Sequence, residues 1–348
     1  WWLLGIARSV LPLGQKGAEM STLPSDVMPF RFAIQAYRSE SRREWCDLAR
    51  KVEALGYSTL FLADHYLGPG ELIAPTGHRV QTLASIPAMA AAAVVTDTLR
   101  IGSRMTCVSY HLPTVLVKEM ASIDVLSEGR LEIGLGAGWL ANEYAALGIP
   151  FEGAGRRIEL LRETTELMIA AYGGEPVDYR GQQVTSYGYI AVPATIQRPH
   201  PPIMIGGGAP KVLGLAGELA DIVSINFNNS AGVVGSNSIA SSTADETDKK
   251  IAWVREGAGD RFDSIELETA CYFVSVDGVS EITAESLMAR TNLTREELID
   301  FPHAAVGSVT EICEALIRRR ERYGFSYITV GDANIDAFAP VVAQLTGK

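Results

Sequence analysis

The chain has 348 residues, of which 47% are hydrophobic, and a formal net charge of −11. This length suits two domains or one α/β barrel with insertions, whereas the acidic balance and the lack of a lysine- and arginine-rich run argue against nucleic-acid binding. The four cysteines lie far apart without CxxC spacing, which indicates neither a zinc knuckle nor a disulfide framework and favours a reducing cytoplasm.

The chain begins with the apolar segment WWLLGIARSVLPLG. This segment is too short to span a bilayer and lacks the positively charged leading region of a signal peptide. We therefore expect residues 1–29 to be an extension outside the core fold and expect no membrane association. A degenerate signal peptide is the alternative interpretation.

From Phe30 onward, short apolar strands alternate with amphipathic helices. In residues 43–56, for example, Trp45, Val52 and Leu55 fall on one helical face before a glycine stops the helix. In the first half of the chain this alternation predicts strands at 31–36, 58–65, 99–109 and 130–138, and helices at 43–56, 81–95, 113–129 and 155–172.

The second half repeats the pattern after a polar stretch, YRGQQVTSYGY, that predicts a hairpin or an excursion. Each of its strands is followed by a helix-like segment. Eight strands with roughly eight helices predict a single α/β domain over 30–348, a parallel (β/α)8 TIM barrel. An open doubly wound sheet, which usually has fewer strands, is the alternative. The predicted strands of this half are 201–208, 221–227, 267–276 and 326–331.

Three segments, near 175–200, 228–250 and 279–307, interrupt the alternation and are predicted insertions. The second is rich in Ser, Asn and Gly, which is typical of a long loop, and leads into a helix near 245–257. The third contains short helical pieces. In a barrel enzyme these last two segments would lie near the strand ends that carry chemistry, which makes them candidate lids.

Asp64 and His65 stand at the end of the second predicted strand. Barrel enzymes place their active sites at the carboxyl ends of the strands. An imidazole there, next to a carboxylate, can be held in one tautomer and can titrate near neutrality. This pair is therefore our candidate for acid–base catalysis, and the alternative is an aspartate in a turn beside a solvent-facing histidine.

The segment RLEIGLGAGWLANE, residues 130–143, ends the fourth predicted strand in glycines. It fails the dinucleotide-binding fingerprint, because Trp139 stands where the third glycine is required. Trp139 is either an aromatic side chain packed under a loop or a wall of a binding pocket. Asn142 and Glu143 are either a helix cap and a first-turn carboxylate or groups that contact a ligand.

A second glycine run, GGGAPK, lies at a strand-to-helix junction at 206–211. Gly206, Gly207 and Gly208 could present backbone N–H groups and a helix N-terminus to an anion, although a tight turn would also need glycine. The P-loop pattern is absent, which argues against ATP hydrolysis, and no HxH, HExxH or GxSxG motif indicates a metal site or a serine nucleophile.

Four segments together resemble the bacterial luciferase-like monooxygenase superfamily, and more narrowly its deazaflavin-dependent oxidoreductase branch, whose cofactor is the 8-hydroxy-5-deazaflavin coenzyme F-420. The resemblance runs from about Phe30 to the C-terminus. It implies a (β/α)8 barrel, commonly homodimeric, with a flavin or deazaflavin across the carboxyl ends of the strands. The segments are ALGYSTLFLADH, PTVLVKE, SEGRLEIGLGAGWLANEYAALGIPF and RPHPPIMIGGGAPKVLGLAGELAD.

Carried over residue by residue, the resemblance implies that Asp64 and His65 lie beside the deazaflavin ring, with His65 as the proton donor or acceptor. Cys107 and Val108 would match the non-prolyl cis peptide that supports the ring from behind. Such a bond costs roughly 3 kcal/mol and needs a functional reason.

The same resemblance implies that Gly138, Trp139 and Asn142 line the ring, and that the turn from Gly206 to Gly208 meets the cofactor phosphate. In this interpretation the segment 130–143 is a wall for a tricyclic ring, because its glycines would let the ring lie against backbone. Two departures argue against glucose 6-phosphate as the substrate. Trp139 stands where the family's sugar-phosphate dehydrogenases have a glutamate, and the run NFNNS, 226–230, lacks their phosphate-binding lysine.

The function implied is hydride transfer between C5 of the deazaflavin and a small organic substrate. An FMN-dependent monooxygenase that uses oxygen is the nearest alternative on the same barrel. A noncatalytic flavin-binding module is the alternative from another class, because a fold does not fix a function. A cofactor-free barrel hydrolase is disfavoured, since neither a metal cluster nor a paired-carboxylate signature is visible in the sequence.

Overall fold

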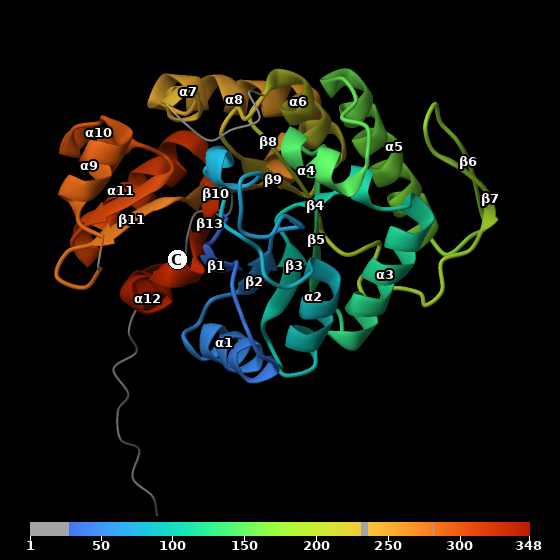
Figure 1. Cartoon of the computed structure of the whole chain (residues 1–348), viewed down its shortest axis with the longest axis horizontal. Helices are drawn as coiled ribbons and strands as arrows, with labels where there is room; N and C mark the ends of the chain where they lie inside the picture. The colour runs from blue at the N-terminus through green and yellow to red at the C-terminus, as the bar shows by residue number, and fades with distance from the viewer. Residues whose placement is uncertain (1–27, 231–235, 281) are drawn as a thin grey trace, which may run out of the picture.

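The computed structural model describes residues 28–230, 236–280 and 282–348. At its centre is a closed barrel of parallel strands surrounded by helices (Figure 1). The barrel closes because β3 pairs with β5, so that each barrel strand has a hydrogen-bonded neighbour on both sides. The eight barrel strands are β1 (Arg31–Ala36), β2 (Thr59–Leu62), β3 (Arg100–Ser103), β5 (Leu131–Gly136), β8 (Ile203–Gly207), β9 (Ile222–Ile225), β10 (Glu266–Cys271) and β13 (Phe325–Gly331).

Local sequence signals set the ends of the helices. Before α11 (Val309–Tyr323), Ser308 accepts a hydrogen bond from the backbone of Glu311, whose carboxylate accepts one from the backbone of Ser308, which is a capping box. Gly324 ends this helix at a φ of 83°, a left-handed conformation that glycine adopts without steric cost. The helices of the described chain are α1 (Arg42–Ala54), α2 (Ser85–Ala93), α3 (Pro113–Leu126), α4 (Ala141–Leu147), α5 (Ala154–Tyr172), α6 (Pro210–Leu219), α7 (Ser236–Ala240), α8 (Ala244–Ala258), α9 (Ala284–Thr291), α10 (Arg295–Asp300), α11 (Val309–Tyr323) and α12 (Ile335–Leu345).

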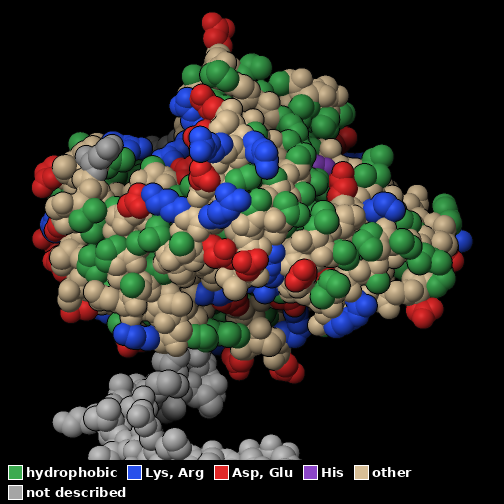
Figure 2. Space-filling model, turned by 90° about the horizontal axis from the view of Figure 1, so that it is seen from below, with side chains coloured by type: hydrophobic (Ala, Val, Ile, Leu, Met, Phe, Trp, Pro, Cys, Tyr) green, Lys and Arg blue, Asp and Glu red, His purple; other side chains and the backbone are tan. Residues whose placement is uncertain are grey.

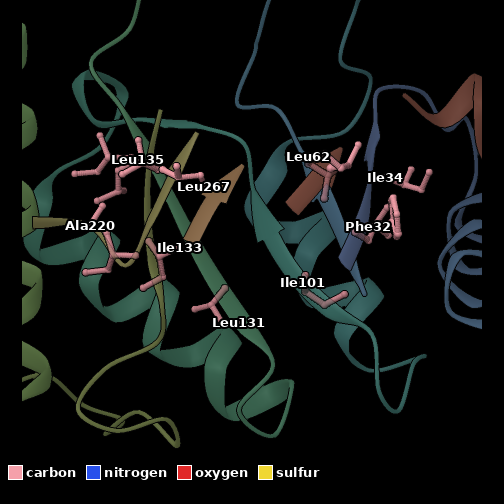
Figure 3. Packing of buried hydrophobic residues seen from close by; sticks show 14 of the residues in the cluster. Phe32, Ile34, Leu62, Ile101, Leu131, Ile133, Leu135, Ala220 and Leu267 are labelled. Atoms are coloured by element: carbon pink, nitrogen blue, oxygen red, sulfur yellow. The ribbon is translucent and has the colours of Figure 1, made fainter. Parts of the chain in front are cut away.

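The main hydrophobic core lies between the strands and the surrounding helices. Phe32 and Ile34 of β1 and Leu131, Ile133 and Leu135 of β5 belong to this core (Figure 3). They occupy every second position of their strands, because successive side chains of a strand point to opposite faces. Burying one such side chain stabilises the fold by about 1.5–3 kcal/mol relative to leaving it exposed.

The intervening residues of each strand fill the inside of the barrel. Ala33, Phe61, Met204, Ile222 and Tyr327 pack together at the middle level. This level of apolar side chains separates the polar groups at the amino ends of the strands from those at the carboxyl ends. The barrel interior is therefore a packed core with two polar ends.

One predicted strand is divided in two. The run 267–276 contributes β10 to the barrel, and β11 (Phe273–Val276) then leaves the barrel and pairs in parallel with β12 (Ala304–Gly307). The strand β12 was not predicted, because a stretch of four small and apolar residues carries little periodic signal. Its partner strand comes from a remote segment.

The predicted excursions are present with added detail. The hairpin of β6 (Val177–Arg180) and β7 (Thr185–Tyr189) projects from the side of the molecule beyond α5 (Figure 1). The segment 228–250 contains the short helix α7 before α8, and α9 and α10 are the helical pieces predicted in 279–307. Residues 1–27, which make up nearly all of the expected N-terminal extension, lie outside the described residues, as do 231–235.

The surface carries charges of both signs. On the face shown in Figure 2, lysine and arginine side chains are interspersed with aspartate and glutamate rather than gathered into one basic area. None of the described helices combines the length and the apolar character that crossing a membrane would require.

Candidate functional site

Two carboxylate–imidazole pairs begin at the end of β2, where the chain reaches the carboxyl end of the barrel. The carboxylate of Asp64 lies 2.8 Å from Nε2 of His111, and that of Glu143 lies 2.8 Å from Nδ1 of His65. Both carboxylates are fully buried, while the His65 side chain keeps 14% of its surface exposed. His111 is 11% exposed, so both imidazoles combine a buried carboxylate with partial exposure, and they differ in the nitrogen that the carboxylate binds: Nδ1 in His65 and Nε2 in His111.

The partner of His65 differs from the prediction. The sequence suggested that the adjacent Asp64 would hold the imidazole, but successive residues of an extended chain point in opposite directions. Asp64 accepts hydrogen bonds from Ser85 Oγ at 3.0 Å and from the backbone N–H of Cys107 at 3.0 Å, besides that from His111. Asp64 therefore ties β2 to the end of the third barrel strand, and Glu143 takes the place beside His65.

Glu143 lies in the first turn of α4 and uses both of its carboxylate oxygens. Oε2 accepts from His65 Nδ1 and from the hydroxyl of Tyr110 at 2.9 Å. Oε1 accepts from the backbone N–H groups of Tyr66 and Leu67. Burial raises the pKa of the Glu143 carboxyl, but the hydrogen bond and charge of His65 and the other donors outweigh burial and lower it. Glu143 is thus a charged carboxylate with four donors.

This contact fixes how His65 can react. A carboxylate only accepts hydrogen bonds, so the Nδ1 of His65 must carry a proton. In the neutral imidazole the lone pair then resides on Nε2, which can accept a proton and return it. The arrangement is that of a general acid–base residue whose tautomer is set by a buried carboxylate.

Two further rings pack around His65 and form an aromatic wall. The ring centre of His78 lies 4.0 Å from that of His65, and Trp139 lies 6.1 Å from His65 and 5.9 Å from His78. Burial and the neighbouring charge of His65 lower the pKa of His78 to about 3, so His78 is neutral near pH 7. Trp139 also packs against residues of the loop after β2, namely Leu67, Ile73 and Val80. This packing is expected for an aromatic side chain under a loop, and the role of Trp139 as a wall of a cofactor pocket stays a prediction.

The cis peptide lies three residues before the expected place. It joins Arg104 to Met105, whereas the expectation from the resemblance was Cys107–Val108. After this bond, β4 (Thr106–Cys107) resumes the third barrel strand and pairs with β5. Cys107 and Val108 are buried beyond it, so that they support the strand end from within.

Arg104 enters the barrel at this bond and organises its carboxyl end. The side chain is 3% exposed, and Nε donates to Glu268 Oε1 at 3.0 Å. Burial lowers the pKa of Arg104, but the charge of Glu268 outweighs this effect and holds the pKa above its ordinary value. All five N–H donors are used, so Arg104 joins β1, β9 and β10 across the barrel. The remaining acceptors are Gln35 Oε1, Tyr272 Oη, Ser224 Oγ and Asn226 Oδ1.

The glycines of the strand ends make room for the protein's own side chains. A Cβ on Gly206 would lie 2.6 Å from Met105 Cε, and one on Gly136 would lie 3.1 Å from Met105 Cβ. A Cβ on Gly138 would overlap the Tyr144 hydroxyl. At Gly136 and Gly138 the space in the direction of a Cβ is thus filled by Met105 and Tyr144, while the expectation that a ring lies against this backbone stays a prediction.

The remaining predicted site residues lie on the rim. Gly206, Gly207 and Gly208 lead into α6, whose N-cap is Ala209. Because a methyl side chain cannot cap a helix and Pro210 has no N–H, the backbone N–H groups of Lys211 and Val212 are the donors that α6 can offer to an anion. Asn142 is exposed, and its amide donates to the carbonyl of Leu72 at 3.0 Å, which ties α4 to the loop after β2.

These residues fit a flat aromatic cofactor that carries a phosphate group. His65, His78 and Trp139 offer an aromatic wall at the strand ends, and the N-terminus of α6 offers an anion site on the same end of the barrel. Oε2 of Glu268 is buried and has no hydrogen-bond partner within the described chain, so a polar acceptor remains unused at this end. No group of three His, Cys, Asp or Glu side chains among the described residues could hold a metal ion.

Sequence reasoning missed the roles of three residues. Glu143 was noted as a first-turn carboxylate, but its partner His65 lies 78 positions away in the chain. His78 sits in a loop without periodic pattern, and Arg104 looked like an ordinary strand residue. The signal that could have singled out Arg104 is a charge within an otherwise apolar strand, which is seldom buried unless it is paired.

Sequence comparison places these features in a known group. The family described as luciferase-like monooxygenase matches residues 27–236. An F420-dependent glucose-6-phosphate dehydrogenase from Microbacterium testaceum is 30% identical over 200 residues, which cover 56% of each chain. A 5,10-methylenetetrahydromethanopterin reductase from Methanopyrus kandleri is 25% identical over 209 residues, covering 57% of this chain and 56% of that protein. The chain thus spans little more than half the length of these curated relatives.

Comparison of structures gives the same fold over nearly the whole chain. The coenzyme F420 dependent tetrahydromethanopterin reductase from Methanopyrus kandleri has a TM-score of 0.70 at 18% identity and covers 92% of this chain and 100% of that one. A long-chain alkane monooxygenase has a TM-score of 0.69 at 13% identity, covering 92% and 91%. At these identities the likeness shows the barrel, while the sequence match over 27–236 covers more than half of the residues. The chain therefore belongs to the luciferase-like monooxygenase family.

Proposed function

We propose that this protein is a deazaflavin-dependent oxidoreductase that transfers a hydride between C5 of coenzyme F-420 and a small organic substrate. The observation that carries the proposal is the geometry of His65, whose side chain is 14% exposed: its Nδ1 is held by the buried Glu143, and no hydrogen bond within the described chain engages Nε2, which can therefore exchange a proton. The names of the two curated relatives and of the reductase structure support the choice of this branch.

The proposed reaction gives the cofactor and His65 different roles. A bound deazaflavin would supply or accept the hydride at C5. Reduction of a carbonyl group also requires a proton at its oxygen, and oxidation of an alcohol releases that proton. His65 Nε2 is suited to both directions, because the charged Glu143 stabilises the imidazolium form after proton uptake.

The aromatic wall supports this role by restricting what reaches His65. His78 and Trp139 cover two sides of the imidazole, and His78 is neutral, so it adds no positive charge near the reacting atoms. Such side chains orient a substrate and exclude water. With Trp139 at this place, we propose a substrate without a sugar phosphate.

Cofactor binding tests the proposal directly. The purified protein would be titrated with coenzyme F-420 and, separately, with FMN, following tryptophan fluorescence. Because the chain has five tryptophans, the variant Trp139→Phe identifies the share of quenching that comes from the site. Tight binding of the deazaflavin alone supports the proposal. A preference for FMN favours a monooxygenase, and binding of neither cofactor contradicts both assignments.

The proton-handling role predicts a specific loss of turnover. His65→Asn keeps an N–H donor for Glu143 but lacks the titrating nitrogen, so we expect turnover to fall by about 10²–10⁴-fold. The measurement is the rate of the deazaflavin absorbance change with a substrate found by screening. His111→Gln is the matched control, because His111 makes an equally short bond to Asp64 through Nε2, whose place the longer glutamine amide can take. Turnover of His65→Asn within about threefold of the unaltered protein would contradict this role.

A further inference from the structure

Glu143 connects two parts of the site through its two oxygens. Oε2 faces His65 Nδ1 and the Tyr110 hydroxyl, and Oε1 faces the backbone N–H groups of Tyr66 and Leu67. The first set orients the imidazole, and the second set fixes the start of the loop 66–80. Because a carboxylate is one rigid planar group, both sets are oriented together.

A second contact from the same helix holds the same loop. Asn142, the neighbour of Glu143, donates to the carbonyl of Leu72 at 3.0 Å. This loop carries His78, whose ring lies 4.0 Å from that of His65. The first turn of α4 therefore locates both the imidazole and the ring that covers it.

We infer that Glu143 is the positioning residue that sets the tautomer of His65 and the place of the loop 66–80 at the same time, an inference that rests on the proposed role of His65. The chemistry requires a carboxylate, since all four partners are donors. A glutamine has one acceptor oxygen and one NH₂ group. It can satisfy the imidazole in its present tautomer or the loop, but not both.

The buried Glu163 provides a matched comparison. Its carboxylate accepts from the backbone N–H groups of Gln182, Gln183 and Val184, so it also holds a loop, but no imidazole is among these partners. Glu163→Gln should weaken the fold in the same manner as Glu143→Gln. It should leave the chemistry of His65 unchanged.

The test uses the protein without any cofactor. Nitrogen NMR of ¹⁵N-histidine-labelled protein reports which ring nitrogen of His65 carries the proton, with His65→Asn to assign the signal. Hydrogen exchange reports the protection of the Tyr66 and Leu67 amides. In the unaltered protein we expect protonated Nδ1 and protected amides. In Glu143→Gln we expect the Nδ1 tautomer or the amide protection to be lost, and in Glu163→Gln we expect both to remain.

Two outcomes would overturn the inference. One is an Nε2–H tautomer of His65 in the unaltered protein, a result that does not depend on whether a variant folds. The other is a folded Glu143→Gln protein that keeps both the tautomer and the amide protection.

Kinetics adds an independent readout once a substrate is known. Glu143→Gln should lower kcat by about 10²–10⁴-fold with a smaller change in KM, since a wrong tautomer removes the base without removing the binding surface. Glu143→Asp should restore part of kcat because the charge remains. If the NMR result holds but no deazaflavin binds, the proposed function fails while the role of Glu143 toward His65 stands.

Discussion

The two ends of the barrel use charge in opposite ways, although the same strands build both. At the amino end, Glu132 accepts from Arg31, from Arg100 at 2.6 Å and from the Tyr327 hydroxyl at 2.9 Å. Arg31 also pairs with Glu266. Every charge in this group has an opposite partner, and the group closes the barrel below its apolar level.

At the carboxyl end the charges are paired but leave reactive or unused atoms. Glu268, two residues after Glu266 on β10, binds Arg104 with one oxygen and has no partner for the other within the described chain. His65 likewise has one nitrogen held by Glu143, while the imidazole remains accessible. The ion pairs at the amino end stabilise the barrel, whereas the carboxyl end contains the groups that can bind a ligand or exchange a proton. This division is expected when the loops at the carboxyl ends carry the chemistry.

The largest expected effect on stability concerns the amino end. Glu132→Ala would leave Arg31 and Arg100 without their shared carboxylate, and losing one partner of a buried ion pair costs about 3–5 kcal/mol of unfolding free energy. Urea denaturation measures this loss. Glu40→Ala is the control, because the Arg38–Glu40 pair is exposed at both side chains and its loss should leave the urea midpoint nearly unchanged. A loss below about 1 kcal/mol for Glu132→Ala would contradict the stabilising role of this end.

The next effect concerns packing at the carboxyl end. Gly138 has a φ of 74°, and an added Cβ would overlap the Tyr144 hydroxyl and lie 2.8 Å from Cys107 Sγ. We expect Gly138→Ala to cost about 3 kcal/mol, from the left-handed backbone and from the clash. Gly148→Ala is the matched control, with a φ of 71° and nothing within 4 Å of its Cβ. Its cost should be about 1–2 kcal/mol. Equal losses of unfolding free energy in the two variants would show that the Tyr144 side chain can move away from the added methyl group without destabilising the fold.

The fold was predictable because its signals are local. The alternation of Phe32 and Ile34 with inward residues, and the glycine after the first helix, are readable within a few positions. The departure of β11 from the barrel was not readable, because the backbone N–H of Phe273 donates to the carbonyl of His303, which lies 30 residues later. A strand that depends on such a remote partner leaves little trace in its own sequence.

The sequence predicted which types of residue form the candidate site, but it did not predict which side chains contact one another. The sequence indicated that His65 at a strand end would need a carboxylate, but Asp64 points away from it and Glu143 comes from another strand–helix unit. The glycines were likewise identified, but which atoms fill the space beside Gly138 depends on how Tyr144 packs. The partner of His65 and the atoms beside Gly138 both depend on packing between segments far apart in the sequence. The spacing of residues along the chain does not predict such packing.

The two ends of the barrel should lose stability in different pH ranges. Burial raises the pKa of Glu132, but Arg31 and Arg100 outweigh this effect and lower it below 4.5, so its contribution to stability is complete above pH 4.5 and is lost only in stronger acid. His303 lies among the aromatic rings at the carboxyl end. Burial and the charge of Lys250 lower its pKa from 6.5 to about 3. The unfolded chain therefore binds a proton at His303 below pH 6.5, while the folded chain does not.

This difference predicts the smallest of the three effects. Between pH 6.5 and 5, the proton bound by His303 only in the unfolded chain should reduce the unfolding free energy by about 2 kcal/mol, at about 1.4 kcal/mol per pH unit. His303→Asn keeps a donor for the carbonyl of Ala270 but does not titrate. Urea midpoints at the two pH values should therefore fall less for His303→Asn than for the unaltered protein. If both proteins lose the same unfolding free energy between these pH values, His303 binds a proton in the folded chain as readily as in the unfolded chain. The buried ring would then carry a positive charge, which contradicts the neutral His303 expected from its burial.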